Sequence, residues 1–382
     1  MISDLVMRMK YVYLGLLACA FFKVSWSFLF PQPLPRTHRL FTATSASTGQ
    51  TIKERNVELN PYILQFDYLN EEKLPWSPSG YHSWNWRGYK INYVHLGGED
   101  KSDQKPPLVL IHGFGASVYH WRYNLPVLAR KFNVFAIDLL GFGLSDKPIL
   151  DYTADIWRDQ VLDFTKEVVL PFSHNQPCVI AGNSLGGFTA LYAASDSRAV
   201  EEQLFNGCIL LNAAGSFRPL DGSIDKPQSA IMRKVTEVLQ RFVVSLSFIY
   251  TKQPTRIEQV LKQVYPVNRS AVDRELVASI EHPTQHDNAA EVFYRMVSRN
   301  GAGPTVYVDD LLVALKVPML LLWGIHDPWI RPKNADRIQE LFPGAQRVDV
   351  LAGHCPHDEA PYEVNAAIDS FVSQLAELRN RL

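Results

Sequence analysis

The chain has 382 residues, and its 38 Lys and Arg against 39 Asp and Glu leave a formal net charge of −1. Apolar residues make up 47% and charged residues 20%, as in ordinary globular proteins. This balance excludes a disordered chain, a collagen-like repeat, a coiled coil and a strongly basic nucleic-acid-binding protein. The four cysteines show neither a CxxC pair nor a metal-ligand spacing, so we expect neither a disulfide scaffold nor a bound metal ion.

The first 53 residues differ from the rest in charge. Asp4 is the only acidic residue among them, and without them the chain carries 32 basic and 38 acidic residues. Residues 11–22 form an apolar run of twelve that follows two basic residues, and it is shorter than the ~20 residues that a membrane-spanning helix needs. This pattern is typical of a signal peptide, and small residues allow cleavage after Ala20 or after Ser27.

From the cleavage region to about Lys53 the chain is basic, rich in serine and threonine, and free of acidic residues, as transit peptides are. Either cleavage leaves a phenylalanine at the new N-terminus. A signal peptide followed by a transit peptide with phenylalanine at the junction resembles the bipartite plastid presequence of diatoms and related algae. The resemblance implies that residues 1–53 are a cleaved targeting presequence and that the protein enters a plastid. Secretion or residence in the endomembrane system, a signal anchor over residues 11–30 and a simple transit peptide are the alternatives.

Residues 54–79 are a proline-containing lead-in, and the α/β core is expected over residues 80–214 and 318–382. Short apolar strands alternate there with segments of helical periodicity. This alternation predicts a mostly parallel sheet with helices on both faces. The predicted strands are 84–89, 91–96, 108–112, 132–139, 178–181, 208–212, 319–323 and 347–351, and the predicted helices are 156–170, 185–194, 335–341 and 362–378.

Residues 215–317 interrupt this alternation with a stretch of about a hundred residues that is helical throughout. Helices are predicted at 230–248, 256–265, 273–281 and 289–299. Helices inserted between two strands of a sheet suggest a lid over the core. The aromatic side chains of the insertion either line an apolar pocket or pack the lid onto the core, and the sequence leaves both open: Phe217, Phe242, Phe248, Tyr250, Tyr265, Phe293 and Tyr294.

Residues 182–186, Gly-Asn-Ser-Leu-Gly, fit the pattern G-x-S-x-G and lie between a predicted strand and the helix that begins at Leu185. In a nucleophile elbow the glycines let the backbone turn sharply, so that the serine hydroxyl projects from the sheet. Ser184 is therefore the candidate nucleophile. The alternative is an ordinary glycine-rich turn with an idle serine, which the position between strand and helix disfavours.

A serine hydroxyl needs a base, and the chain order serine, acid, histidine puts that base in the last loop before the final helix. His354 stands there, and His357 is the weaker candidate. Asp327 follows the strand at 319–323 and is the candidate acid that orients the imidazole. The other position allowed for the acid, directly after the strand at 208–212, holds no carboxylate.

A developing oxyanion needs two backbone N–H donors. Leu185, the first residue of the helix after the nucleophile, is expected to supply one of them. Phe114, in the glycine-rich segment after the strand at 108–112, is expected to supply the other. We expect His112 in this segment to stabilise the turn rather than to act as a base.

With these motifs in place, residues 84–378 resemble the α/β-hydrolase family of the AB hydrolase-1 type. The resemblance implies an α/β-hydrolase fold with a mostly parallel eight-stranded sheet, helices on both faces and an inserted helical lid. Within the family the chain looks similar to plastid hydrolases of plants and algae such as pheophytinase and chlorophyll dephytylase, which remove the phytyl ester from chlorophyll pigments. The segments that carry the resemblance are 86–89, 111–116, 120–124, 157–161, 181–187, 261–265, 327–329 and 352–359.

The combined features predict a serine hydrolase that transfers an acyl group from a carboxylic ester to water. Ser184 attacks, His354 moves the proton and Asp327 holds the imidazole, so that no metal or organic cofactor is needed. An apolar ester such as a pigment phytyl ester or a lipid ester is the expected substrate. Trp121 and Trp329, each next to a catalytic loop, are expected to line its pocket.

Two other functions stay open. The Gly-Asn-Ser-Leu-Gly-Gly elbow also resembles that of meta-cleavage hydrolases, which split a C–C bond, and an arginine in the pocket would favour that reaction. Epoxide hydrolase and haloalkane dehalogenase chemistry is disfavoured, because those relatives carry an aspartate where Ser184 stands. A hydrolase fold used as a non-catalytic receptor is the third possibility. Nucleic acid is not an expected partner of the mildly acidic body, whereas peripheral contact with a thylakoid or envelope membrane is compatible with an apolar substrate.

Overall fold

The computed structural model describes residues 56–98, 104–219, 241, 243–298 and 305–380. The predicted presequence, residues 1–53, and most of the predicted helix at 230–248 lie outside these residues. None of the described helices is both long enough and apolar enough to cross a membrane.

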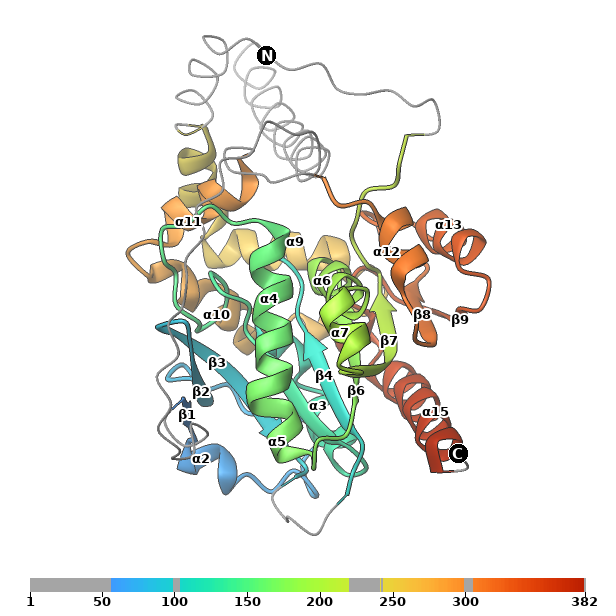
Figure 1. Ribbon diagram of the computed structural model, residues 1–382. Coiled ribbons are helices and arrows are strands. Elements are labelled where there is room, and N and C mark those ends of the chain that lie inside the picture. The colour runs from blue at the N-terminus through green and yellow to red at the C-terminus, as the bar shows by residue number, and fades with distance from the viewer. Residues whose placement is uncertain (1–55, 99–103, 220–240, 242, 299–304, 381–382) are drawn as a thin grey trace, which may run out of the picture.

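Nine strands form one sheet in the order β1-β2-β3-β5-β4-β6-β7-β8-β9 (Figure 1). The pairs from β1 to β3 and the pair β3–β5 are antiparallel, and all other neighbours are parallel. All eight predicted strands are present. The lead-in adds the ninth, β1, which has two residues and is too short to show a pattern of its own. The strands are β1 (Val57–Glu58), β2 (His82–Trp86), β3 (Tyr89–Leu96), β4 (Pro107–Ile111), β5 (Asn133–Ile137), β6 (Cys178–Asn183), β7 (Phe205–Leu211), β8 (Met319–Gly324) and β9 (Gln346–Val350).

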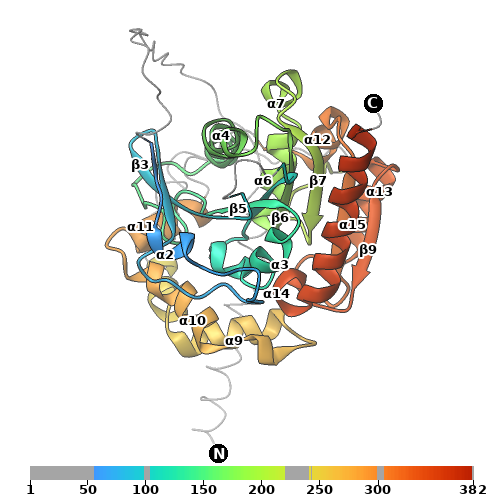
Figure 2. The same ribbon diagram turned by 90° about the horizontal axis from the view of Figure 1, so that it is seen from below.

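Helices cover both faces of this sheet (Figure 2). On one face lie α4 (Ala154–Phe164) and α6 (Leu185–Ala194), and on the other lie α3 (Leu125–Ala129) and α15 (Pro361–Asn380). The remaining elements of the core are α2 (Pro61–Leu64), η2 (Val118–Trp121), the π-helical turn η3 (Thr165–Val169), α5 (Leu170–Phe172), α7 (Ser197–Glu201), α13 (Lys333–Leu341) and α14 (Pro356–Glu359).

Strand β4 illustrates why the central strands are apolar along their whole length. Val109 and Ile111 pack into the hydrophobic cluster on the side of α4 and α6, whereas Leu108 and Leu110 pack into the cluster on the side of α3 and α15. Successive side chains of a strand point to opposite faces, and here both faces are covered by helices. All five residues of β4 are therefore buried.

Between β7 and β8 the regular elements of the described residues are helices, apart from an isolated bridge between Ser216 and Tyr307. This lid lies at the end of the sheet toward which the parallel strands point (Figure 1). The predicted helices at 256–265, 273–281 and 289–299 correspond to α9, α10 and α11. The lid consists of a helix of residues 243–251, α9 (Pro254–Val264), η4 (Arg269–Ala271), α10 (Arg274–Glu281), η5 (His282–Gln285), α11 (Ala289–Val297) and α12 (Val308–Ala314).

Helix α12 was not among the predicted helices. Asp309 and Asp310 look from the sequence like a solvated edge, but they occupy the first turn of α12. Carboxylates at that end of a helix interact favourably with its dipole. Arg218 pairs with Asp310 and donates its backbone N–H to Asp309, which ties the start of the lid to its end.

Candidate active site

Ser184 stands at a strained turn between β6 and α6. Its φ of 55° and ψ of −117° lie in a region that L-amino acids rarely adopt. Three backbone hydrogen bonds hold the residue there, from its N–H to Leu211 and to its carbonyl from Phe188 and Ala214. Backbone strain that the surrounding structure maintains is typical of a nucleophile elbow.

The two glycines of the elbow are required by close backbone contacts. A Cβ on Gly182 would lie 2.1 Å from the Gly186 carbonyl oxygen, and a Cβ on Gly186 would lie 2.3 Å from the Ile111 carbonyl oxygen. Helix α6 therefore begins directly against β6 and β4. The elbow also touches the loop after β4, because a Cβ on Gly113 would lie 3.2 Å from the Cβ of Ser184.

His354 and Asp327 meet on the loops that follow β9 and β8. The imidazole Nδ1 of His354 lies 2.7 Å from Oδ2 of Asp327, and both side chains are buried. In the neutral ring Nδ1 carries the proton and donates a hydrogen bond to the carboxylate. The lone pair is then on Nε2. The sequence predicted that these two residues would come together.

The carboxylate of Asp327 is held by three further donors. Asn212 donates to Oδ2 over 2.8 Å, and the backbone N–H groups of Trp329 and Ile330 donate to Oδ1 over 2.7 and 3.0 Å. Both oxygens are therefore fixed, and so is the direction from which His354 is bound. The sequence shows Asn212 only as a position without a carboxylate, and its contact with Asp327 depends on β7 and β8 lying side by side.

Asn183 links the elbow to the loop of His354. Its amide nitrogen donates to the His354 carbonyl over 2.8 Å and to the Leu211 carbonyl over 3.1 Å. The His354 N–H donates in turn to the Val264 carbonyl of the lid over 3.0 Å. The residue directly before Ser184 thus fixes the backbone that carries the imidazole.

Phe114 and Leu185, the predicted oxyanion donors, stand on either side of the contact between the loop after β4 and the elbow. Leu185 is the first residue of α6, and Phe114 stands between Gly113, which contacts the elbow, and Gly115, whose φ is 71°. Neither backbone N–H donates a hydrogen bond to another described residue. Both are therefore available to a substrate oxygen.

His112 stabilises the turn, as expected. Its Nε2 accepts the Leu139 N–H over 3.0 Å, so the proton is on Nδ1, which bonds to the Gly113 carbonyl over 2.7 Å. Burial lowers the pKa of the imidazole and keeps it neutral.

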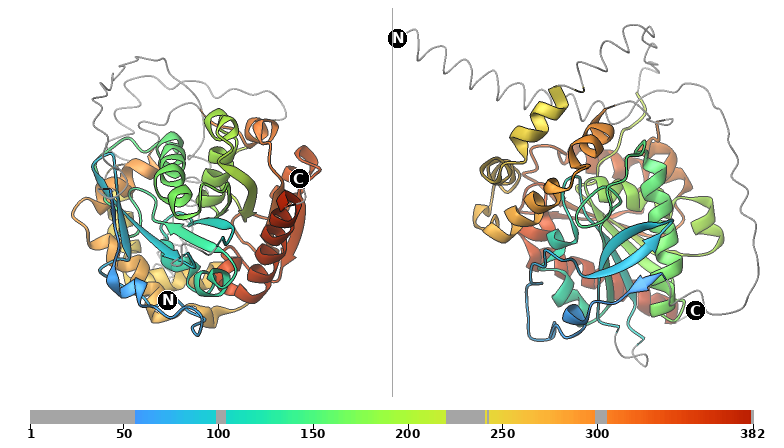
Figure 3. Two further views of the ribbon diagram at one scale, coloured as in Figure 1. Left: turned by 60° about the horizontal axis from the view of Figure 1, so that its bottom comes forward. Right: turned by 90° about the vertical axis from the view of Figure 1, so that its left-hand side faces the viewer.

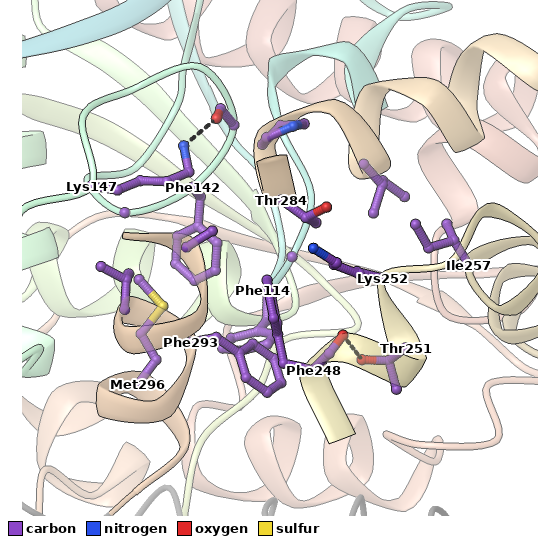
Figure 4. A pocket seen from close by; sticks show the side chains of 17 residues that line it. Phe114, Phe142, Lys147, Phe248, Thr251, Lys252, Ile257, Thr284, Phe293 and Met296 are labelled. Carbon is purple, nitrogen blue, oxygen red and sulfur yellow. Dashed lines mark hydrogen bonds between the residues drawn. The ribbon is translucent and has the colours of Figure 1, made fainter. Parts of the chain in front are cut away.

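An apolar cavity of about 160 Å³ adjoins the Phe114 loop (Figure 4). The core contributes Phe114, Phe142 and Lys147 to its wall, and the lid contributes Phe248, Lys252, Phe293 and Met296. The Phe114 ring lies 5.2 Å from that of Phe142 and 6.0 Å from that of Phe293. Two of the lid aromatics named from the sequence thus line the cavity, whereas Tyr265 and Tyr294 are buried in the packing, Tyr250 is exposed and Phe242 lies outside the described residues.

The two tryptophans expected in the pocket are not among its lining residues. Trp121 is fully buried, and its ring packs 4.2 Å from that of His357. The short helix η2 turns this side chain into the core, and sequence spacing cannot reveal such a direction. Trp329 is half-buried beside the catalytic loop instead, with its ring 4.9 Å from that of His354.

His357 is not a second candidate base in this arrangement. Its side chain is fully buried, in contact with Trp121 and with the ring of His120 at 5.9 Å. Neither ring nitrogen of His120 or His357 has a hydrogen-bond partner among the described residues. Burial lowers the pKa of both imidazoles, to about 3 for His120, so both are neutral at pH 7.

We expect these buried histidines to make the fold sensitive to acid. Burial also lowers the pKa of His82 to about 4. Below about pH 6.5 the unfolded chain binds protons at these residues while the folded chain does not, so the free energy of unfolding falls with pH. We expect a loss of at least about 3 kcal/mol between pH 6.5 and 4.5, measured by urea denaturation.

The matched variants are His120→Gln and His286→Gln, since His286 is exposed. The first should make the pH dependence of the unfolding free energy shallower, and the second should leave it unchanged. Equal slopes in the two variants would contradict this assignment.

Arg122 joins the catalytic loops to the lid, and the sequence did not predict this role. Its fully buried guanidinium donates to Asp358 over 2.8 Å, to Asp273 over 2.8 Å and to the Ala271 carbonyl over 2.7 Å. Tyr265 donates its hydroxyl to the same Asp358 over 2.8 Å. Because Asp358 follows His354 by four residues, this network holds the loop of His354 against η2 and the lid.

No group of three or more His, Cys, Asp or Glu side chains in the described part of the chain could hold a metal ion. The three cysteines that the structure describes, Cys178, Cys208 and Cys355, are free and buried.

Comparison with known proteins gives the same fold. Residues 106–361 match the family model described as alpha/beta hydrolase fold. Pheophytinase, a chloroplastic protein of Arabidopsis thaliana, is 31% identical over 317 residues, which are 71% of this chain and 62% of that protein. Epoxide hydrolase 3 of Xenopus tropicalis is 27% identical over 297 residues, 75% of this chain and 76% of that protein. The crystal structure of a serine hydrolase involved in carbazole degradation, the CarC enzyme, matches with a TM-score of 0.58 and 23% identity over 76% of this chain and 98% of that one.

Proposed function

The chain belongs to the α/β-hydrolase family, and we propose that it is a serine hydrolase that cleaves a carboxylic ester carrying an apolar group. The observation that carries the proposal is the arrangement of three loops. A strained serine, a carboxylate and an imidazole follow β6, β8 and β9 of the parallel part of the sheet, and the carboxylate bonds the imidazole over 2.7 Å. The apolar cavity beside Phe114 supports an apolar substituent on the substrate.

In the proposed reaction the Oγ of Ser184 attacks the ester carbonyl carbon while Nε2 of His354 takes the hydroxyl proton. The carbonyl oxygen becomes negative and is bound by the Phe114 and Leu185 N–H groups. The C–O bond then breaks, and His354 gives its proton to the departing alcohol. Water deprotonated by His354 releases the acid from the acyl-serine, and Asp327 stabilises the imidazolium in both steps.

The serine itself argues against epoxide opening. Attack of a hydroxyl on an epoxide carbon would leave an ether on Ser184, and an ether has no carbonyl carbon for water to attack. Turnover would stop after the first step. An acyl-serine, in contrast, is an ester that the same imidazole can hydrolyse.

Cleavage of a C–C bond is the less favoured candidate. The arginine that would have supported it is not among the described lining residues, where the cations are Lys147 and Lys252. Lys147 donates to the carbonyls of Gly143 and Ser145, which occupies two of its three protons.

We also propose a plastid location, supported by the presequence composition and by the likeness to a chloroplastic protein.

We expect a fluorophosphonate probe to label the protein on a single peptide, the one that contains Ser184, identified by mass spectrometry. We also expect kcat/KM for p-nitrophenyl esters to rise from acetate to about hexanoate and then level off. A cavity of this size compares with a ~150 Å³ cavity that holds benzene, and each buried CH₂ contributes about 0.8 kcal/mol, roughly fourfold. A folded protein that neither reacts with the probe nor hydrolyses any ester of the series would contradict the proposal and favour the non-catalytic receptor.

A further inference from the structure

The lid helix of residues 243–251 faces the interior of the protein on one side. Val244 and Phe248 are buried, and the Phe248 ring lies 5.2 Å from that of Phe293 in α11. Phe248, Thr251 and the following Lys252 line the cavity beside Phe114 (Figure 4). This side of the helix therefore belongs to the wall of the proposed substrate site.

The opposite side of the same helix is apolar and exposed. Leu246, Ile249 and Tyr250 are 58%, 54% and 44% exposed, and their spacing of three and four residues puts them on one stripe. We call these three side chains the outer face. The helix lies beside α11 at the periphery of the molecule, away from the sheet (Figure 3). Within the described part of the chain, no side chains pack over this stripe closely enough to bury it.

A cation lies next to the outer face, in a stretch of the sequence without acidic residues. From residue 238 to residue 257 the sequence has no acidic residue, but it has Arg241, Lys252 and Arg256. Arg241 is paired with Glu291, and the Lys252 ammonium lies on the cavity side, 5.8 Å from the centre of the Phe248 ring. Arg256 has no carboxylate partner among the described residues. The Arg256 guanidinium lies 4.4 Å from the centre of the Tyr250 ring, next to the outer face. This local charge is opposite to the net charge of the rest of the body.

We propose that the outer face docks on a lipid surface that contains anionic headgroups. Leu246, Ile249 and Tyr250 enter the boundary between headgroups and acyl chains, and Arg256 lies at the headgroups. An apolar helix face flanked by cations is the pattern of helices that lie in this boundary. The proposal rests on the proposed function, since the docked helix would also line the cavity in which an apolar ester from the bilayer is cleaved.

Fluorescence of a label on the outer face tests the docking directly. The full chain would carry Cys19→Ser and Ile249→Cys, labelled with an environment-sensitive nitrobenzoxadiazole dye, since the other three cysteines are buried. Vesicles would contain equal parts of phosphatidylglycerol and phosphatidylcholine, or phosphatidylcholine alone. The control label is at Val313→Cys, which is 79% exposed on α12 on a different side of the lid (Figure 1).

We expect a blue shift at position 249 with anionic vesicles, a smaller one with neutral vesicles, and none at position 313. Each cation at an anionic surface contributes about 1 kcal/mol, which is roughly fivefold in binding. Salt should weaken the binding because it screens this attraction. The proposal is overturned if position 249 does not respond, if both positions respond equally, or if position 249 is blue-shifted in buffer and unchanged by vesicles. The last result would mean that protein covers the outer face.

A second variant separates docking from catalysis. Leu246→Ser, Ile249→Ser and Tyr250→Ser would be combined, and the matched control combines Leu59→Ser, Leu64→Ser and Leu69→Ser, which are exposed apolar residues of the lead-in. The outer-face variant should lose about tenfold or more in hydrolysis of p-nitrophenyl palmitate held in anionic vesicles. It should keep its rate on dissolved p-nitrophenyl acetate.

The two proposals fail in different ways. If the outer-face variant loses activity equally on both substrates, or if the lead-in control shows the same loss as the outer-face variant, the docking proposal is overturned. If no variant and no wild-type protein hydrolyses either ester, the proposed function fails. The label at position 249 then still decides whether the outer face docks, because that measurement needs no turnover.

Discussion

Replacing Ser184 with alanine is expected to lower kcat for p-nitrophenyl acetate about a millionfold. The hydroxyl is the only group of the elbow that can form the acyl intermediate, and the oxyanion donors alone retain ~10³-fold acceleration over water. The elbow itself should stay intact, because its geometry is held by backbone bonds to Leu211, Phe188 and Ala214 rather than by the hydroxyl. Thermal unfolding would verify this.

Kinetics of further variants show whether Ser184, His354 and Asp327 act as one catalytic unit or contribute independently to kcat. His354→Ala should lose as much as Ser184→Ala, and the double variant should lose no more than either. Asp327→Asn should lose about 10⁴-fold, because an amide cannot accept hydrogen bonds on both sides from His354, Asn212 and the backbone N–H groups. Ser195→Ala, at the far end of α6, is the control and should be neutral. Losses that add up in the double variant would argue against a triad.

Replacing Arg122 with methionine is expected to reduce the free energy of unfolding by about 3–5 kcal/mol. The guanidinium is fully buried against Asp358, and burial already raises the pKa of that carboxyl. Without the arginine, Asp358 keeps only the Tyr265 hydroxyl, and an unpaired buried charge is strongly destabilising. Urea denaturation at pH 7 measures the loss.

Two further variants show whether burial is the cause. Lys131→Met removes the exposed ion pair with Asp369 and should change stability by less than about 1 kcal/mol. Arg122→Met combined with Asp358→Leu should recover part of the loss, because both buried charges are then gone. An Arg122→Met protein as stable as the Lys131→Met protein would contradict this account.

Local pattern accounts for most of what the sequence predicted about the core. The strands that end at Asn183 and Gly324 are continuous apolar runs, and helix α6 begins where the elbow motif says it must. Ser184, Asp327 and His354 could be named as candidates because each follows a strand in the chain order of the fold. Parallel strands bring their carboxyl ends to one edge of the sheet, so this order already implies proximity.

The pattern failed where side-chain direction decided the outcome. Trp121 is next to a catalytic loop in sequence, but η2 turns it into the core against His357. Asn212 has no signature as a residue that holds an aspartate until β7 and β8 are placed side by side. The aromatic residues of the lid all occur in segments of helical periodicity, so the sequence does not distinguish those at the cavity from those in the interior. The packing of the lid places Phe248 at the cavity and Tyr265 in the interior.

By itself the sequence determined the family and the layered α/β architecture and named the candidate nucleophile, acid and base, because these depend on local periodicity and on the order of motifs along the chain. Only the tertiary structure decided the network around Arg122, the walls of the cavity and the exposed outer face. The network and the cavity unite segments that are distant in the chain: Arg122 lies 151 residues from Asp273 and 236 from Asp358. Contacts over such separations are set by how the helices pack on the sheet, and a single sequence carries no local signal for that packing.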